Sequence, residues 1–132
     1  MPIVVGARKR LELMKAMPEL KAKLWANVEK LQAGLKERGL DIGNTNSCVT
    51  PVYMHGSVPE AMALVKDMRD NYSIFCSIVV YPVIPRGMIL LRLIPTAGHT
   101  FEDIDITLDA FAAIADKLKQ GAYKTADQLA TT

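Results

Sequence analysis

Two apolar runs joined by a short, stiff connection constrain this chain more than any other feature. Residues 72–80 and 88–94 are rich in aromatic, β-branched and aliphatic side chains, and seven residues lie between them. A crossover between parallel strands needs a dozen or more residues, so the two runs are predicted to pair antiparallel. Pro82 and Pro85 stiffen the connection, and Gly87 turns the chain into the second run.

Helices are predicted around these runs. Pro18 suits the first turn of a helix, where its missing N–H loses no partner, and Gly39 suits the position just after the helix end. A further helix before Pro18 carries Val5, Leu11 and Met14 and is expected to pack at an angle to the next one. Between Pro18 and Gly39, apolar residues recur every three or four positions along one face: Leu20, Leu24, Val28, Leu31 and Leu35.

Two later helices have recognisable N-terminal caps. Ser57 and Glu60 have the spacing of a capping box, in which the Glu60 side chain reaches back to Ser57. Thr100 caps the last helix, with Asp103 three positions on, and Gly121 ends it. The inward faces of the two helices are predicted to be Ala61, Leu64, Val65 and Met68, and Ile104, Leu108, Phe111, Ala115 and Leu118.

The order of the elements predicts the fold class. Residues 48–54 form one more strand, in which Pro51 indicates an edge position or a bulge. The order α, α, β, α, β, β, α predicts an α/β (α+β) two-layer fold, with a small, mostly antiparallel sheet, helices packed on one face and a helical N-terminal segment before it. We expect one domain over residues 1–132, divided into a helical lead-in at 1–40, the α/β part at 41–121 and a tail at 122–132.

Charge, hydropathy and cysteine content exclude several classes of partner. The 16 basic and 14 acidic residues are mixed along the chain, so there is no concentrated basic face for nucleic acid. The basic run Arg8-Lys9-Arg10 is interpreted as a solvated helix face. No apolar run approaches the roughly 18–20 residues of a membrane span, so no transmembrane segment is predicted. Cys48 and Cys76 show no metal-ligand spacing and are interpreted as small buried hydrophobes, which fits a cytoplasmic location.

Arg92 is a charged residue inside the second apolar run, and it needs an explanation. Its guanidinium stays protonated in essentially any protein environment, and burying it without an anion is costly. One explanation is structural: an ion pair with Glu60, Asp67 or Asp103, or exposure to solvent at a strand end. The other is functional: a bidentate fork for the carboxylate of a ligand, with the Pro82–Pro85 loop as a rigid lip. The residues alone leave both open.

Most enzyme constellations are absent from the sequence. There is no glycine-rich phosphate loop, no nucleophile elbow, no cluster of metal ligands and no acidic pair spaced for general acid–base catalysis. His55 lies in a turn, and His99 is interpreted as a residue at the start of the last helix whose ring bonds the backbone. We therefore assign no catalytic, cofactor-binding or metal-binding residue within this chain.

The stretch YPVIPRGMILLRLIPTAGHT, residues 81–100, resembles a known family. A P-x-x-P loop, a glycine, a strand ending in Leu-Arg and a small-residue stretch closing in His-Thr before an amphipathic helix are similar to the C-terminal domain of the α-oxoamine synthases. ELKAKLWANVEKLQAGLKERGLDI, residues 19–42, resembles the helix that leads into that domain. TPVYMHGSVPEAMALVKDM, residues 50–68, resembles its first strand and helix, so the resemblance covers nearly the whole chain.

This resemblance implies an activity and a cofactor. The α-oxoamine synthases are pyridoxal-phosphate (PLP) enzymes of the aspartate-aminotransferase fold type, which condense an amino acid with an acyl-CoA or reverse such a reaction. They include 8-amino-7-oxononanoate synthase and 5-aminolevulinate synthase. This chain looks most similar to the serine palmitoyltransferase and glycine C-acetyltransferase (2-amino-3-ketobutyrate CoA ligase) branches. The resemblance implies PLP in a full-length, homodimeric enzyme whose substrates are serine or glycine and an acyl-CoA.

The resemblance also implies roles for particular residues. Arg92 matches the arginine that holds the carboxylate of the amino-acid substrate. Some members carry a second arginine where this chain has Tyr81, which puts the second carboxylate contact in doubt. The PLP-binding lysine and its companions lie upstream in the family, so the chain looks like a C-terminal fragment that lacks the large PLP-binding domain, and we expect neither bound PLP nor activity from it alone. A mobile loop that closes over the site matches Tyr81, Pro82, Val83, Ile84 and Pro85.

Two other interpretations stay open at this point. A stand-alone regulatory domain would bind an amino acid through Arg92, since small α/β sensor domains have a similar order of elements. An oligomerisation module would instead pair Arg92 internally. The reading frame upstream of Met1 separates them, because a large domain with a PLP-binding lysine there identifies the enzyme.

Overall fold

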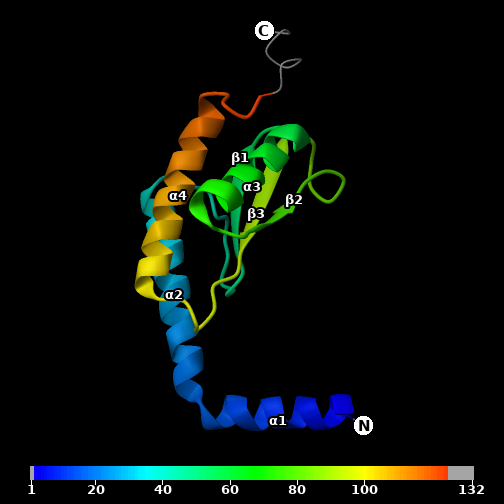
Figure 1. Cartoon of the computed structure of the whole chain (residues 1–132), viewed down its shortest axis with the longest axis vertical. Coiled ribbons are helices and arrows are strands. Elements are labelled where there is room, and N and C mark those ends of the chain that lie inside the picture. Colours follow the sequence, from blue (N-terminus) through cyan, green and yellow to red (C-terminus); the bar gives the residue numbers. More distant parts are fainter. Residues whose placement is uncertain (1, 125–132) are drawn as a thin grey trace.

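A computed structural model describes residues 2–124 of the chain, and this part contains four helices and one three-stranded sheet (Figure 1). The part of the expected tail that begins at residue 125 lies outside the described residues. In chain order the elements are α1 (Pro2–Ala16), α2 (Pro18–Glu37), β1 (Thr50–His55), α3 (Val58–Tyr72), β2 (Ser77–Val79), β3 (Met88–Leu93) and α4 (Phe101–Lys119).

β3 is the central strand of the sheet, and β1 and β2 pair antiparallel with it on either side. The predicted antiparallel pairing of the two apolar runs is therefore confirmed. Pro51 lies on β1, which is an edge strand, as its missing N–H required. Residues opposite each other in the ladder share a face, so Val52 and Leu91 point to one side of the sheet, whereas Tyr53 and Leu90 point to the other.

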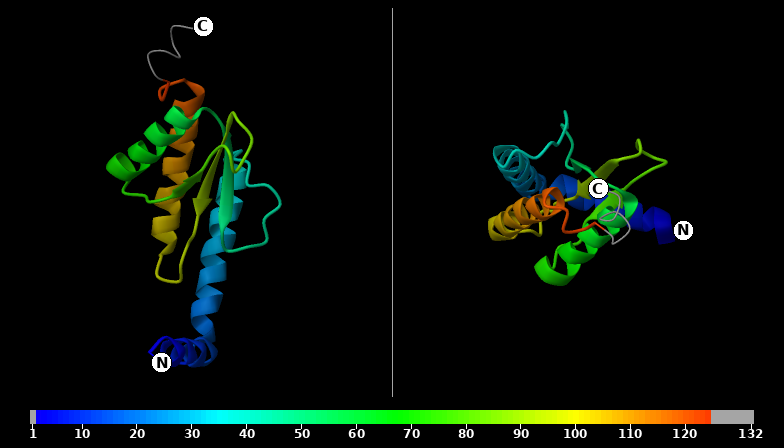
Figure 2. Two further views of the ribbon diagram at one scale, coloured as in Figure 1. Left: turned by 90° about the vertical axis from the view of Figure 1, so that its right-hand side faces the viewer. Right: turned by 90° about the horizontal axis from the view of Figure 1, so that it is seen from above.

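Three helices cover one side of the sheet. Side chains from α2, α3 and α4 join those of the strands in one hydrophobic core, to which Leu31, Leu64, Leu91 and Phe111 belong. α2 and α4 lie side by side (Figure 2). They approach closely at Gly34, where an added Cβ would overlap a methyl carbon of Leu108. The predicted two-layer fold, with helices on one face of a small antiparallel sheet, is confirmed.

The predicted helix caps are also present. The Ser57 side chain accepts the N–H of Glu60, whose carboxylate in turn accepts the N–H of Ser57. Thr100 and Asp103 form the same reciprocal pair at the start of α4. Gly39 follows α2 with a φ of +72°, a left-handed conformation that glycine adopts without strain.

The strand predicted over residues 72–80 is wrong in its extent. α3 continues to Tyr72, and Ser73 then adopts a left-handed conformation with a φ of 57°. The N–H of Ile74 bonds the carbonyl of Met68 and closes the helix end, so the chain pairs with β3 only over Ser77–Val79. Between helix and strand, Ile74 and Cys76 pack against the core instead of forming a ladder, whereas Phe75 is exposed.

The two cysteines are free thiols, and their burial differs. Cys76 is buried, as predicted, and its apolar surroundings raise the pKa of its thiol to about 11. Cys48 is only half-buried, because it lies in the loop before β1 rather than in the strand that the sequence suggested from residue 48.

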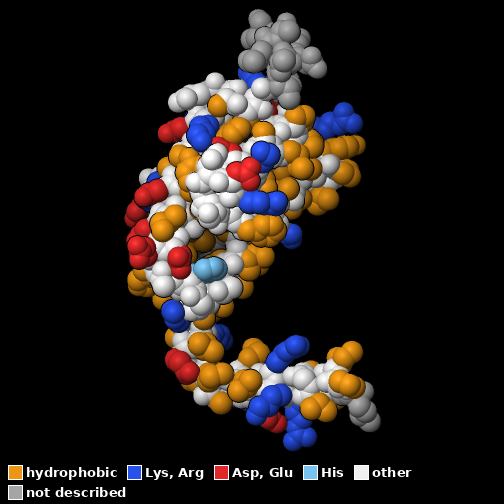
Figure 3. Space-filling model, in the orientation of Figure 1, with side chains coloured by type: hydrophobic (Ala, Val, Ile, Leu, Met, Phe, Trp, Pro, Cys, Tyr) orange, Lys and Arg blue, Asp and Glu red, His pale blue; other side chains and the backbone are white. Residues whose placement is uncertain are grey.

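α1 stands apart from the core. The helix runs crosswise at the foot of α2, and Figure 3 shows apolar and basic side chains together on this arm. None of its residues is buried, and its large apolar side chains are between 42% and 86% exposed. Arg8 and Lys9 lie 3.2 Å and 3.7 Å from the Glu12 carboxylate, as expected for a solvated basic face. None of the described helices is both long and apolar enough to cross a membrane.

Candidate functional site

Arg92 lies on the side of the sheet that faces away from the helices. We call this side the open face, because none of its residues is fully buried. Arg92 is near the C-terminal end of β3, opposite Pro51 of β1 and Ser77 of β2. Its side chain is exposed, and its Nε donates a hydrogen bond of 3.0 Å to the hydroxyl oxygen of Ser77. The open face consists of Pro51, Tyr53, His55, Ser77, Val79, Met88, Leu90 and Arg92.

None of the carboxylates considered as internal partners meets Arg92. Glu60 and Asp103 serve in the capping boxes of α3 and α4, and Asp67 forms an ion pair of 2.8 Å with Lys117. Across residues 2–124, Arg92 takes part in no ion pair. Of the two structural explanations, exposure at a strand end is the one that the structure shows, and the terminal nitrogens Nη1 and Nη2 have no partner among the described residues.

Asp67 is the most strongly held carboxylate in the described part of the chain. It accepts hydrogen bonds from Lys117 at 2.8 Å, from the Tyr123 hydroxyl and from the Asn71 amide. These bonds, with that from Lys117 as the largest cause, lower the pKa of Asp67 from 3.8 to about 2. The cluster ties α3 to α4 and to the segment after α4. Its role is therefore structural, within the helical layer.

The predicted lid loop lies toward the opposite end of β3 from Arg92. The chain leaves β2 after Val79, which pairs with Leu90, and it joins β3 at Met88, four residues before Arg92. At about 3.3 Å per residue, this separation is about 13 Å along the strand. The Arg86 guanidinium stacks 4.5 Å from the centroid of the Tyr81 ring, across the base of the loop. The structure does not bring Tyr81, Pro82, Val83, Ile84 and Pro85 up to Arg92, and their role as a lid stays a prediction.

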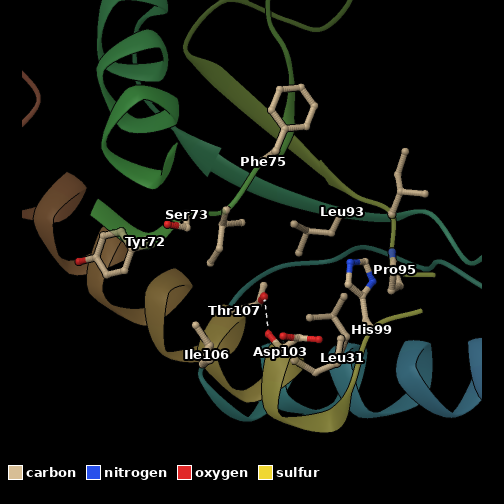
Figure 4. A pocket seen from close by; sticks show the side chains of 13 residues that line it. Leu31, Tyr72, Ser73, Phe75, Leu93, Pro95, His99, Asp103, Ile106 and Thr107 are labelled. Carbon is tan, nitrogen blue, oxygen red and sulfur yellow. Dashed lines mark hydrogen bonds between the residues drawn. The ribbon is translucent and has the colours of Figure 1, made fainter. Parts of the chain in front are cut away.

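A groove of about 490 Å³ opens beside the C-terminal end of β3 (Figure 4). His99 and Asp103 add polar groups to a lining that is mainly apolar. Ile94 also lines the groove, but no residue of the open face does. The apolar lining includes Leu31, Tyr72, Phe75, Leu93, Pro95 and Ile106.

Asn27 holds the loop that forms one wall of this groove. Its buried amide donates to the carbonyls of Thr96 and His99, both at 3.0 Å, and so fixes the chain between β3 and α4 to helix α2. The His99 ring accepts the Thr96 N–H at Nδ1 over 2.9 Å, which confirms that His99 bonds the backbone at the start of the last helix. No group of three potential metal ligands occurs within residues 2–124.

Two polar residues of this region were missed by the sequence reasoning. Ser77 and Asn27 have no motif that marks them, because their partners are 15 residues away for Ser77 and at least 69 residues away for Asn27. Ser77 could have been predicted from the register of the two apolar runs, because antiparallel pairing in a known register decides which residue lies opposite Arg92. The register required the true start of β2, which the sequence misplaced.

Comparison with known proteins identifies the family. A family model described as aminotransferase class I and II matches residues 2–111. The chain belongs to this family. The predicted membership among the α-oxoamine synthases is confirmed by the relatives of the chain within it.

Three of these relatives define the match. Cysteate-C-fatty acyltransferase of Capnocytophaga ochracea is 69% identical over 121 residues, which are 92% of this chain and 29% of the relative. The 8-amino-7-oxononanoate synthase of Symbiobacterium thermophilum is 34% identical over 116 residues, 88% of this chain and 29% of the relative. Serine palmitoyltransferase from S. paucimobilis, solved with a bound PLP–myriocin aldimine, matches with a TM-score of 0.67 at 26% identity, over 76% of this chain and 25% of that chain. The chain thus spans less than a third of the length of these relatives.

Proposed function

We propose that this chain is the C-terminal domain of a PLP-dependent acyltransferase that joins an amino acid to an acyl-CoA. The observation that carries the proposal is Arg92, which exposes Nη1 and Nη2 on the open face with no ion-pair partner among the described residues. Two parallel N–H groups match the two oxygens of a carboxylate, so such an arginine suits an anion that arrives with the substrate. The 69% identity to a C-fatty acyltransferase supports the reaction class.

We propose the domain division that the sequence predicted, with a longer protein around it. A large PLP-binding domain upstream and a second copy of the enzyme are the proposed neighbours. Two uncovered surfaces of this chain support that arrangement: the apolar side chains of α1 and the open face of the sheet. The division is a single domain over 1–132, with a lead-in at 1–40, the α/β part at 41–121 and a tail at 122–132.

We propose that the described residues do not themselves hold PLP. Enzymes of this kind hold the cofactor through a Schiff base to a lysine. The lysines of residues 2–124 lie on the helices or after α4, and none lies on the sheet. Lys30 and Lys117 are moreover engaged by Asp105 and Asp67. We therefore place PLP on the upstream part, where it would supply an electron sink for the bond to be broken at Cα.

The proposed task of this chain is to orient the substrate. A carboxylate held by two N–H groups of Arg92 fixes the rotation of the amino acid about its Cα, and correct orientation is a large part of such catalysis. The loop from Tyr81 to Pro85 is proposed to move over the bound substrate and exclude water. The stack between Tyr81 and Arg86 marks the base about which this loop would move.

We propose cysteate as the first amino acid to test, because the relative with 69% identity is a cysteate-C-fatty acyltransferase. Serine and glycine, which the resemblance to serine palmitoyltransferase and glycine C-acetyltransferase implies, are the alternatives. All three present an α-carboxylate to Arg92, so Arg92 does not decide among them. A fatty acyl-CoA is the proposed acyl donor. We also propose a cytoplasmic location, which the two free thiols support.

The longer protein encoded by the complete reading frame tests this proposal. The purified, PLP-loaded protein is mixed with a fatty acyl-CoA and with cysteate, serine or glycine, and the released CoA thiol is measured. We expect release with at least one of the three and none when the amino acid is omitted. If no CoA is released with any of the three amino acids, the acyltransferase proposal is wrong. Calorimetric binding of an amino acid to the isolated chain would instead favour the regulatory domain.

A further inference from the structure

We infer that Ser77 is a positioning residue that decides how Arg92 presents its guanidinium to a carboxylate; this inference rests on the proposed function. Ser77 lies directly opposite Arg92 in the β2–β3 ladder. Its hydroxyl oxygen accepts the Nε–H of Arg92 over 3.0 Å. The contact joins the edge strand to the central strand on the open face, where the substrate carboxylate is proposed to bind.

An arginine can hold a carboxylate in two bidentate ways. In the side-on way, Nε and one terminal nitrogen donate to the two oxygens; in the end-on way, Nη1 and Nη2 donate. Because Ser77 takes the Nε–H, the side-on way is blocked, and Nη1 and Nη2 remain as the donors without a partner among the described residues. Ser77 thereby selects the end-on way before any ligand arrives.

The surroundings of the pair make Ser77 well suited to this task. Ile78, the next residue of β2, packs against the core and anchors the short strand. On the other side of Arg92 lies Pro51, whose ring offers no hydrogen-bonding group. Within the described residues, Ser77 is therefore the polar side chain that orients Arg92. Since Arg92 is exposed, losing the hydroxyl leaves Nε hydrated rather than buried and unpaired, and the fold should tolerate the loss.

The expected effect is on the affinity for the carboxylate alone. In Ser77→Ala the guanidinium is free to move until a ligand orders it, which should weaken amino-acid binding about three- to tenfold, as for one flexible side chain ordered on binding. Ser77→Thr keeps the hydroxyl on a residue type that strands favour and should restore affinity. Ser47→Ala is the matched control, because among the described residues the Ser47 hydroxyl accepts only the local N–H of Val49.

The experiment uses the full-length, PLP-loaded enzyme and two ligands. One is the amino acid that the wild type uses, and the other is the same molecule without its carboxylate: taurine for cysteate, 2-aminoethanol for serine or methylamine for glycine. Dissociation constants come from titrations of the cofactor absorbance. Ser77→Ala should weaken the amino acid about three- to tenfold and leave the amine within twofold, whereas Ser77→Thr and Ser47→Ala should resemble the wild type. In an Arg92→Ala background, Ser77→Ala should have no further effect.

The outcomes separate this inference from the function on which it rests. Equal weakening of amino acid and amine, or a full additional loss in the Arg92→Ala background, shows that Ser77 does not act through Arg92. If Arg92→Ala removes the preference for the amino acid over the amine but Ser77→Ala leaves it intact, the inference is wrong and the proposed function stands. If Arg92→Ala itself leaves that preference unchanged, both are wrong.

Discussion

The two faces of the sheet differ in what their residues do, although they alternate along the same strand. Leu91 is 0% exposed and packs in the core, whereas Arg92, the next residue, points to the open face and is exposed. This alternation follows from strand geometry, in which successive side chains point to opposite sides. If the proposed function is right, stability depends on one face of the sheet and ligand binding on the other. Substitutions on one face should change the free energy of unfolding, and those on the other should change ligand affinity.

The largest expected effect is a loss of stability when the core-facing side of the sheet is disrupted. Leu91→Ala should lower the free energy of unfolding by about 2–5 kcal/mol, because it opens a cavity in a fully packed core. Its neighbour Leu90, half-buried on the open face, is the matched control, and Leu90→Ala should lower it by about 1 kcal/mol or less. Urea unfolding of the 132-residue chain measures both. Similar losses at the two positions would show that the open face is covered within this chain.

The second effect concerns Arg92 on the open face. In the full-length enzyme, Arg92→Lys should raise the dissociation constant of the amino acid tenfold or more, because an ammonium does not reproduce two parallel N–H···O bonds and each charge-assisted bond is worth about 1.5–3 kcal/mol. Acyl-CoA affinity and the melting temperature should change little. Amino-acid titrations and thermal melts of the two proteins check this. A collapse of stability with unchanged affinity would contradict the assigned site.

A third and smaller effect is the pH dependence of stability that we expect from Asp67 in the helical layer. The pKa of Asp67 is about 2 in the folded protein, below its ordinary value of 3.8. A lowered pKa means that the folded state binds this proton less readily, so the stabilisation is complete above about pH 4 and is lost as the pH falls through 2. We expect it to be on the order of 1–2 kcal/mol. Urea unfolding at pH 7, 4 and 2.5 should show a larger loss in the wild type than in Asp67→Asn, in which other carboxylates such as Asp103 still titrate.

Asp70→Asn is the control for this pH experiment. Asp70 forms an exposed ion pair of 3.0 Å with Lys66 one turn away on α3, and such pairs are worth well under about 1 kcal/mol. The Asp70→Asn variant should therefore follow the wild type from pH 4 to pH 2.5. If Asp67→Asn follows it as well, the Asp67 cluster does not stabilise the fold in the way that its hydrogen bonds indicate.

The last prediction is that the isolated chain has neither bound PLP nor activity. Neither face of the sheet offers a lysine within residues 2–124, so the isolated chain should show no visible absorbance band of bound PLP and no turnover of an amino acid with acyl-CoA. Borohydride reduction followed by mass spectrometry measures any PLP adduct. A stoichiometric adduct at one lysine of this chain would contradict both the absence of a cofactor site and the proposed location of PLP upstream.

The local features of the fold were predictable from the sequence because their causes are local. A capping box such as Ser57 with Glu60 is satisfied within one turn, and a connection of seven residues permits only antiparallel pairing of the runs on either side. Pro18 and Gly39 delimit α2 by their own backbone preferences. The sequence alone also showed that Arg92 needs an explanation, since a charge in an apolar run requires a partner or water.

Tertiary structure decided whether a carboxylate of the chain pairs with Arg92 and where β2 begins. Asp67 meets Lys117 and Tyr123 across 50 and 56 residues, which removes it as a partner of Arg92. Only Tyr72 of the 72–80 run is helical, and Ile74 and Cys76 then pack against the core before pairing begins at Ser77, so that Ser77 lies opposite Arg92. Such outcomes depend on contacts between residues that are far apart in the sequence. Many side chains compete for the same space and partners, so no short stretch of sequence predicts which of them meet.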